Sequence, residues 1–404
     1  MNYIPLPLDK IDFDRPLPIN VWDPVGNLLL RKGSAIQADR PRHFFESHQA
    51  CVTEADFRAW QRAYDRKIYA LLRQGASLDL IGSVMMPDAL QESDYAAGFE
   101  VQGGWLDLRE VLHGILSLGE EARRPMDRIE GIQDKVRSLL KTDADESLFI
   151  LFQGLADTTL GYCATHALLC AVVCELTAQK LNLPEVIRAL LVRAALLMNI
   201  GMAKEQDVLA RQKAKPDELQ QALIGSHPQK SVAILRGFGL TDEDVLDIVA
   251  WHHEPDETLG LSRNLECRRI LRVADRFVAR MAPRSTRTAL SGMGAAKSMV
   301  THASGEEARV GSAMATAVGF YPPGTYVKLA NGEVAVSVRR GFRANTPMVV
   351  SIVDNLGVAM SSYIAKDTRD PQFTIRAPVN FERVRQQINA ARILKAVPKP
   401  DHWT

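Results

Sequence analysis

Two adjacent histidines, His252 and His253, followed by Glu254, form the segment with the clearest chemical potential in this chain. Imidazole and carboxylate groups are good metal ligands and awkward core residues. Such a pair, taken alone, more often marks a polar helix end that faces water. The rest of the chain changes this balance, because side chains of the same kinds recur along it and can converge from separate helices on one point. These residues are His166, His227 and Asp275.

Each of these further residues also has a structural explanation when it is taken singly. His227 precedes Pro228 and can cap or bend its helix, and Asp275 is followed by Arg276, which suits a surface ion pair. His166 alone is more often a core histidine with a satisfied hydrogen bond than a metal ligand. The prediction of a metal site therefore rests on the ordered set rather than on any one member.

Length and composition indicate a globular protein of two or three domains. The chain has 404 residues, of which 46% are hydrophobic and 24% are charged, as is usual for soluble proteins. A net charge of +1 gives no electrostatic reason to expect nucleic acid or a membrane surface as a partner. No stretch predicts a signal peptide or a membrane span, and the five cysteines form no Cys-x-x-Cys pair. We therefore expect a cytoplasmic protein.

The N-terminal residues 1–75 are predicted to form a small module with a β-hairpin and a helix. The hairpin spans residues 17–33, where Asp23-Pro24 and Gly26-Asn27 supply turn residues between apolar flanks. Apolar residues at helical spacing predict a helix over residues 54–74. Residues 76–105 lack a clear period and are predicted to be a linker.

Residues 106–282 have an almost entirely helical pattern, and residues 106–318 are predicted to form a helical bundle. Helices are expected at residues 106–121, 125–141 and 146–156, with others around His166 and after Pro184. A further helix begins with a capping-box-like pair, Thr241 and Asp244. The apolar face of this helix includes Val249, and His252 lies on the same face one turn later. His166 and His252 are therefore expected to point toward the core.

The pattern becomes that of strands after residue 318. Strands are predicted around residues 325–329, 333–338 and 347–353, with Asn331-Gly332 as a hairpin turn. Residues 319–360 are thus expected to be a small antiparallel β appendage, and residues 361–404 a tail with one helix over 380–396. The predicted fold class is mainly α, a helical bundle with small β modules at both ends.

The ordered set of ligands resembles the HD-GYP family of bacterial cyclic di-GMP phosphodiesterases, which belongs to the HD superfamily. The matching segments follow one another over residues 145–355. Residues 160–166 look like the family's Tyr-x-x-x-His helix, and residues 195–202 look like its Ala-x-Leu-His-Asp-Ile-Gly-Lys signature. Residues 226–228 look like its His-Pro helix. Residues 251–254 look like its double histidine, and residues 273–277 look like the segment with its closing Asp. The resemblance implies an HD-type helical bundle that binds divalent metal ions.

The chain departs from the family's pattern at three functional elements. The His-Asp pair, which the resemblance implies as a terminal ligand and a carboxylate bridging two metals, reads Met198-Asn199. A thioether is a poor ligand for these ions, and a neutral amide cannot replace a bridging anion. The lysine that resembles a phosphate contact is Met202. The Gly-Tyr-Pro motif reads Gly260, Leu261 and Ser262.

These departures favour a degenerate, non-catalytic signalling module that binds a cyclic dinucleotide such as cyclic di-GMP or a signalling-protein partner. The alternative is a metal-dependent cyclic di-GMP phosphodiesterase with a residual metal site. No catalytic residue is assigned. We expect either no cofactor or one divalent ion, zinc or iron, at His227, His252 and His253, with His166 and Asp275 as a vestigial pair. A homodimer is a further expectation of this interpretation.

Overall fold

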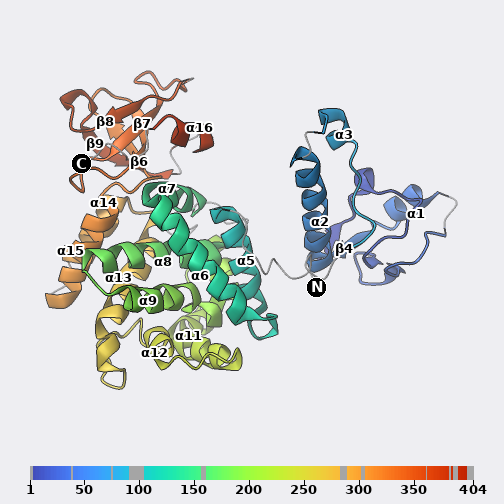
Figure 1. Cartoon of the computed structure of the whole chain (residues 1–404), viewed down its shortest axis with the longest axis horizontal. Helices are drawn as coiled ribbons and strands as arrows, with labels where there is room; N and C mark the ends of the chain where they lie inside the picture. The colour runs from blue at the N-terminus through green and yellow to red at the C-terminus, as the bar shows by residue number, and fades with distance from the viewer. Residues whose placement is uncertain are drawn as a thin grey trace. The chain divides into compact units, whose positions relative to one another are not determined.

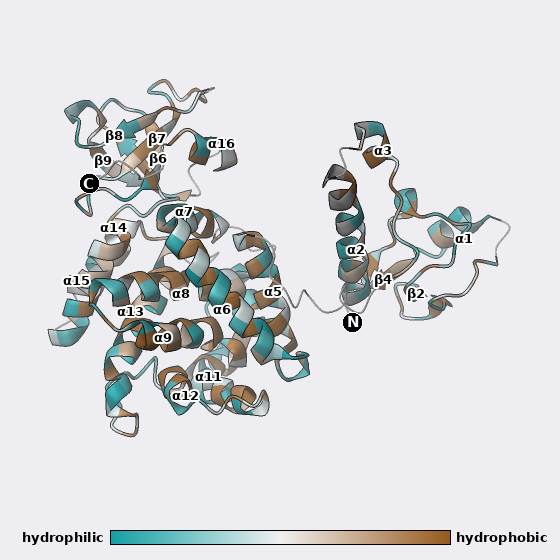
Figure 2. Ribbon diagram, viewed as in Figure 1, coloured by the Kyte–Doolittle hydropathy of each residue, from teal (hydrophilic) through white to brown (hydrophobic). Residues whose placement is uncertain are grey.

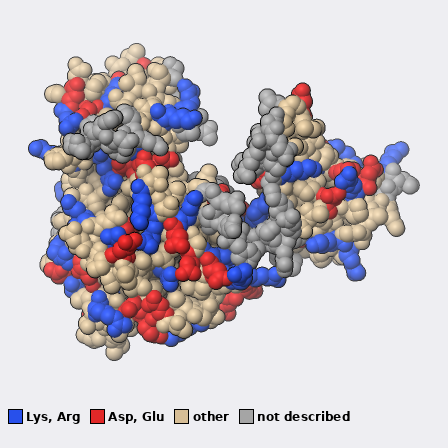
Figure 3. All heavy atoms as spheres, in the orientation of Figure 1, with Lys and Arg blue, Asp and Glu red and all other residues tan. Residues whose placement is uncertain are grey.

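The computed structural model describes residues 3–37, 40–73, 76–90, 104–155, 161–282, 289–301, 305–360, 362–381, 384 and 390–397. The chain divides into two compact units, Met1–Phe99 and Glu100–Thr404 (Figure 1). Lys and Arg side chains alternate with Asp and Glu side chains over the visible face of the larger unit (Figure 3). This mixture agrees with the nearly neutral net charge of the chain.

The smaller unit is built on a four-stranded antiparallel sheet with the order β1-β4-β2-β3. The predicted hairpin is present as β2 and β3, and the Asp23 carboxylate accepts hydrogen bonds from the backbone N–H groups of Val25 and Asn27 in its turn. The predicted helix is also present, as α2. The elements are β1 (Tyr3–Pro5), η1 (Leu8–Lys10), β2 (Val21–Trp22), β3 (Leu28–Leu30), α1 (Pro41–Ser47), β4 (Cys51–Thr53), α2 (Glu54–Arg73) and α3 (Leu78–Gly82).

The first part of the predicted linker, residues 76–90, packs against this sheet unit instead of leaving it. Trp60 donates a hydrogen bond from Nε1 to the Pro87 carbonyl at 2.6 Å, and the Met86 N–H donates to the Lys10 carbonyl at 2.8 Å. Val84 is buried. The segment is held by hydrogen bonds of its backbone, which produce no apolar period in the sequence. Because it belongs to the smaller unit, the linker boundary at residue 76 is wrong. Residues 91–103 lie outside the described residues.

The larger unit contains the predicted helical bundle. Its helices are α5 (Trp105–Leu118), α6 (Pro125–Thr142), α7 (Ala144–Gly154), α8 (Tyr162–Lys180), α9 (Glu185–Leu197), α10 (Ala203–Arg211), α11 (Glu218–Gly237), α12 (Glu243–Ala250), α13 (Leu265–Met281), α14 (Gly292–Thr301) and α15 (Gly305–Val318). Short 3-10 turns lie at η2 (Gly119–Glu121), η4 (Ile200–Met202) and η5 (Ser262–Asn264). The mainly helical fold class is thereby confirmed.

Helix α8 is the centre of this bundle, and every residue from Tyr162 to Ala178 is buried. It packs against α9, α13 and α15, among other helices, and the ribbon around it is largely hydrophobic (Figure 2). Helix α8 and the segment Glu185–Arg211 are long and apolar enough to cross a membrane, yet 94% and 67% of their most apolar windows are buried inside the fold. A helix that is apolar on all sides is expected in a protein core.

The β appendage is a five-stranded antiparallel sheet with the order β8-β7-β6-β5-β9. The three predicted strands are present as β5 (Tyr326–Leu329), β6 (Val334–Arg339) and β7 (Met348–Val353). Two more, β8 (Ala365–Asp367) and β9 (Ile375–Val379), lie in the predicted tail, with η6 (Pro371–Phe373) between them. The boundary at residue 360 is therefore wrong, because β9 returns to pair with β5.

The predicted C-terminal helix over residues 380–396 is described as the shorter α16 (Ala390–Lys395). The residues immediately before it, 385–389, lie outside the described part of the chain.

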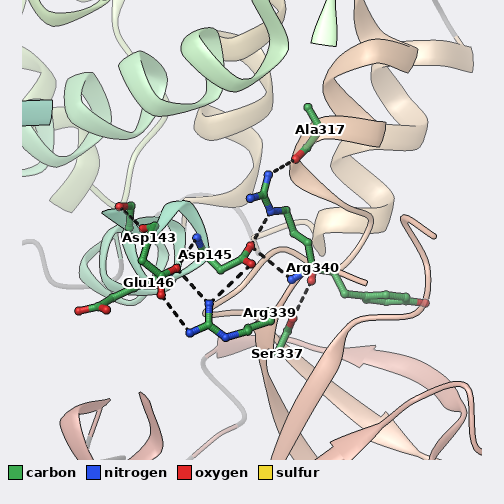
Figure 4. A network of polar contacts seen from close by, with 9 residues as sticks. Asp143, Asp145, Glu146, Ala317, Ser337, Arg339 and Arg340 are labelled. Carbon is green, nitrogen blue, oxygen red and sulfur yellow. Dashed lines mark hydrogen bonds and ion pairs between the residues drawn. The ribbon is translucent and has the colours of Figure 1, made fainter. Parts of the chain in front are cut away.

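A polar network joins the appendage to the helical body (Figure 4). At the end of β6, Arg339 binds the Asp143 carboxylate, which also caps the first turn of α7. The next residue, Arg340, pairs with Asp145 and donates a hydrogen bond to the Ala317 carbonyl in α15. The sheet and the bundle are thus bonded through two successive arginines.

Candidate metal centre

His227, His252 and His253 lie together, and one donor atom from each falls within 4.8 Å of the others. The ring centroids are 5.3 Å apart for His227 and His252, 5.0 Å for His227 and His253, and 4.2 Å for His252 and His253. His227 and His252 are buried, whereas His253 is exposed. The three imidazoles therefore form a cluster that is reached from solvent on the side of His253. We name these three residues the trihistidine cluster.

The two buried imidazoles are oriented by the same kind of hydrogen bond. His227 Nδ1 contacts the Ile224 carbonyl at 2.7 Å, and His252 Nδ1 contacts the Val249 carbonyl at 2.7 Å. A carbonyl only accepts, so each Nδ1 carries the proton and each Nε2 keeps its lone pair. Neither Nε2 has a hydrogen-bond partner among the described residues. This is the arrangement in which histidines bind metals, with Nδ1–H held by a backbone carbonyl and Nε2 free to ligate.

The electrostatic setting keeps these imidazoles neutral. Burial lowers the pKa of His227 to about 4, because the charged form loses its hydration. Burial likewise lowers the pKa of His252 to about 3, and the neighbouring His253 and His227 act in the same direction. Neutral imidazole is the form that coordinates a metal ion, so at neutral pH both groups are ready to bind one.

Different local structures place the three histidines. His227 lies inside α11, directly before Pro228, while His252 and His253 follow the end of α12. Helix α12 begins at an Asp242 cap, whose carboxylate accepts hydrogen bonds from the N–H groups of Asp244 and Val245. The predicted cap at Thr241 is thus wrong by one residue, since the neighbouring Asp242 carboxylate is preferred to threonine at a helix N-cap.

A second group of ligand-type side chains lies on α8 and α13. His166 Nε2 is 2.8 Å from Asp275 Oδ1, and Cys170 Sγ is 3.5 Å from the same His166 nitrogen. The donor atoms of these three residues also lie within 4.8 Å of one another. His166 and Asp275 are the predicted pair, whereas the sequence interpretation missed Cys170. The spacing of four residues between His166 and Cys170 is the signal that could have found it, because such residues share a helix face.

The carboxylate of Asp275 lies close enough to both groups to influence them. Burial would raise the pKa of Asp275, but the hydrogen bond that this carboxylate accepts from His166 lowers it well below its usual range. The five predicted ligands therefore share one electrostatic region, as two adjacent sets rather than one.

The segment that resembles the His-Asp signature lies directly against α11. Ser231 donates a hydrogen bond to the Met198 carbonyl at 2.8 Å and accepts one from the Gly201 N–H at 3.0 Å. A Cβ on Gly201 would lie 2.7 Å from the His227 carbonyl oxygen, so only glycine permits this approach. Met198, Asn199 and Met202 are all buried. The backbone of the signature is therefore packed beside His227 although its ligand side chains are replaced.

The segment at the position of the Gly-Tyr-Pro motif is bound to α12 by a hydrogen bond. It consists of Gly260, Leu261 and Ser262. Asp247 accepts a hydrogen bond from the Leu261 N–H at 2.7 Å. The buried Arg268 lies under Gly260, where an added Cβ would come within 1.4 Å of its Nη1 atom. These residues form a packed turn between α12 and α13.

Asp207, one of two carboxylates just beyond the signature segment, contributes to the scaffold rather than to either ligand group. It accepts a hydrogen bond from the Cys163 N–H at 2.7 Å, at the first turn of α8. A carboxylate at a helix N-terminus satisfies a free N–H and the helix dipole.

The trihistidine cluster can hold one ion through three neutral ligands, with a further position open toward solvent.

One family model and one solved structure are similar to this chain. The model of the HD domain family matches residues 163–280, a range that contains every predicted metal ligand. The chain is also similar to the solved structure of Bd1817, a HDG"Y"P protein from Bdellovibrio bacteriovorus, at 15% identity and a TM-score of 0.40 over 78% of this chain and 98% of that chain. That likeness is too distant to carry a function across. No curated protein matches the chain. Residues 163–280 therefore form an HD domain.

Proposed function

We propose that the chain is a degenerate HD-GYP-like signalling protein whose HD domain is a non-catalytic binding module. The ligand would be a cyclic dinucleotide such as cyclic di-GMP, or a protein partner that reads the state of the HD domain. The expected setting is the cytoplasm, and a homodimer would fit this role. Two grounds support the proposal: the HD domain at residues 163–280 and the resemblance of the motifs in residues 145–355 to those of the HD-GYP family.

One observation carries this proposal: Met198 and Asn199 are buried at the position where the family signature has its His-Asp pair, while the trihistidine cluster keeps ligand geometry. Two dications a few ångströms apart repel strongly unless an anion lies between them. A neutral amide at residue 199 supplies no such anion. Two-metal activation of a water for attack on a phosphodiester is therefore not expected here.

A single divalent ion, zinc or ferrous iron, fits the trihistidine cluster. Three neutral imidazoles match the ligand number of zinc sites that leave one position for water. Bound there, the ion would supply a Lewis acid and a polarised water. His227 and His252 would hold it rigidly through their Nδ1 hydrogen bonds, and His253 would ligate from the exposed side. A residual metal-dependent phosphodiesterase activity through this ion is the second candidate function.

The experiment combines hydrolysis and binding of cyclic di-GMP on the full-length protein. Purified protein, stripped with chelator and reloaded with zinc or ferrous iron, is assayed for turnover by chromatography and for binding by calorimetry. The proposal expects no detectable turnover with either metal, and saturable binding if the dinucleotide is the ligand. If cyclic di-GMP does not bind, the proposal expects the ligand of the HD domain to be a protein partner. Robust turnover that disappears in His252→Ala would overturn it and establish the second candidate function.

A further inference from the structure

Cys170 provides a ligand that the family's ordered set does not contain. It lies one helical turn after His166 on α8 and faces Asp275 on α13. We propose that His166, Cys170 and Asp275 form a second metal site, with a mixed nitrogen, sulfur and oxygen donor set that takes a thiophilic ion such as zinc. The proposal is independent of the trihistidine cluster, and it changes the sequence-based expectation of at most one ion.

The distances suit a small tetrahedral ion. Bonds of about 2.0 Å to nitrogen and about 2.3 Å to sulfur separate these two donors by roughly 3.5 Å around tetrahedral zinc. The Cys170 Sγ and His166 Nε2 atoms are 3.5 Å apart. The Asp275 oxygen is closer to His166, at 2.8 Å, as a hydrogen bond requires. Only this carboxylate has to move, by roughly half an ångström, for all three to share one ion.

The surroundings orient His166 for this role. Its Nδ1 atom is 3.2 Å from the Tyr162 hydroxyl, which can accept the Nδ1 proton. Without an ion, Nε2–H donates to the Asp275 carboxylate; with an ion bound, the ring proton would lie on Nδ1 and the Nε2 lone pair would face the ion. The His166 ring is fully buried, and both neighbours come from helices that pack along their length. The ligands are therefore pre-positioned by the core rather than by a loop.

Charge explains how such a site can exist beside the trihistidine cluster. A thiolate and a carboxylate together carry two negative charges, which neutralise one divalent ion. A second ion at three neutral imidazoles would then face a neutral centre instead of another dication, so the repulsion that a bridging carboxylate relieves would be much smaller. The Cys170 thiolate would thus supply a negative charge that the neutral Asn199 amide does not supply.

Binding at this site requires one proton to leave. Burial, with a contribution from Asp275, raises the pKa of the Cys170 thiol well above its usual range. Without metal the group is thus a neutral thiol. Zinc binding breaks the S–H bond, forms the S–Zn bond and releases the proton to solvent, with no change of oxidation state.

Cobalt substitution tests the proposal on the full-length protein in a reducing buffer. Cobalt(II) bound to a thiolate gives a charge-transfer band in the near ultraviolet, which imidazole and carboxylate ligands do not produce. The wild-type protein should show this band, and Cys170→Ala should lose it. The matched control is Cys174→Ala, the same change one turn further along α8 at an equally buried cysteine. It should keep the band.

Zinc content separates this site from the proposed function. In His252→Ala, which disables the trihistidine cluster, one zinc per chain should remain, and adding Cys170→Ala should remove it. Circular dichroism of each variant in chelator verifies that it is folded, and Cys170→Ser serves if the alanine variant is not. A cobalt band that is missing from the wild type, or that persists in Cys170→Ala, would overturn the second site. Zinc content unchanged by His252→Ala would instead argue against the trihistidine site alone.

Discussion

Arg339 binds both oxygens of the Asp143 carboxylate, with Nη1 3.0 Å from Oδ1 and Nη2 2.9 Å from Oδ2. The two side chains are only 8% and 6% exposed. The same carboxylate accepts hydrogen bonds from the N–H groups of Asp145 and Glu146 at the start of α7. One buried ion pair thus connects the end of a strand with the beginning of a helix (Figure 4).

Replacing Arg339 by Met should destabilise the larger unit by about 3–5 kcal/mol, because it leaves the Asp143 charge buried without its partner. Urea unfolding followed by circular dichroism measures the change. Arg343→Met is the matched control, since this arginine is exposed on the loop after β6, and it should change stability by less than about 0.5 kcal/mol. Equal effects of the two substitutions would contradict the structural role of the pair.

His252→Ala should abolish the stabilisation that zinc gives through the trihistidine cluster. A ligand that binds only the folded state at a concentration of 100 times its Kd stabilises it by about 2.7 kcal/mol. The melting temperature of the wild type should therefore rise on adding zinc, and that of His252→Ala should rise less. His43→Ala, an exposed histidine of the smaller unit, should behave as the wild type does. A full zinc-dependent shift in His252→Ala would contradict the site.

The metal-free protein should lose stability as the pH falls below about 6.5. His227 and His252 stay neutral in the folded state, with pKa values of about 4 and about 3, while the unfolded chain binds protons near pH 6.5. The unfolded state therefore holds more protons between pH 6.5 and about 4, so stability rises with pH in this window. Each group contributes a slope of up to about 1.4 kcal/mol per pH unit.

The contribution of one histidine is measured by difference. His252→Gln removes one titrating group, and its stability should depend less steeply on pH than that of the wild type in chelator. Denaturant unfolding at a series of pH values between 7 and 4 gives both slopes. Identical slopes would show that His252 is not held neutral by burial.

Restoring the family's pair with Met198→His and Asn199→Asp should raise metal affinity without ensuring activity, because Met202 and Leu261 still differ from the family pattern. Both positions are buried, and a buried carboxylate without its metal is costly. The double variant should thus melt lower in chelator than in zinc, by a wider margin than the wild type. Equal melting temperatures in both conditions would indicate that residue 199 does not face the metals.

Gly201→Ala should weaken metal binding together with stability. Its Cβ would lie 2.7 Å from both the His227 carbonyl oxygen and the Ser231 nitrogen, so the backbone of η4 or α11 must shift, at a cost of about 1–3 kcal/mol. The movement would displace His227. Gly225→Ala is the control in the same helix α11, where an added Cβ meets nothing within 4 Å. Isothermal titration with zinc on both variants checks the expected loss in Gly201→Ala alone.

The sequence was most informative where local periodicity decides structure. The helices of the bundle and the strands β5 to β7 follow from their apolar spacing and turn residues. The grouping of His227 with His252 and His253, and of His166 with Asp275, was also predictable, because a family supplies the order of ligands along the chain. The helices and strands depend on short stretches of sequence, and the ligand groups depend on the known order of ligands in the family.

Cys170 and β9 were missed for physical reasons. Helix α8 is buried on all sides, so its pattern has no polar face against which the direction of Cys170 could be judged. Strand β9 is short and alternates weakly, and its partner β5 lies far away in the chain. Its existence depends on that distant pairing rather than on its own residues. The hydrogen bond from the Cys163 N–H to Asp207 also joins residues far apart in the sequence, 44 positions, so local patterns do not predict it.

The hydroxyl of Ser231 contacts only main-chain atoms of the signature segment, the Met198 carbonyl and the Gly201 N–H. This attachment is the same whatever side chains residues 198 and 199 carry. The segment can therefore exchange its two ligands without loosening from α11 or disturbing the His227 ring beside it. Under the proposed function, the His-Asp signature could thus be lost one residue at a time while the backbone of the HD domain keeps its shape.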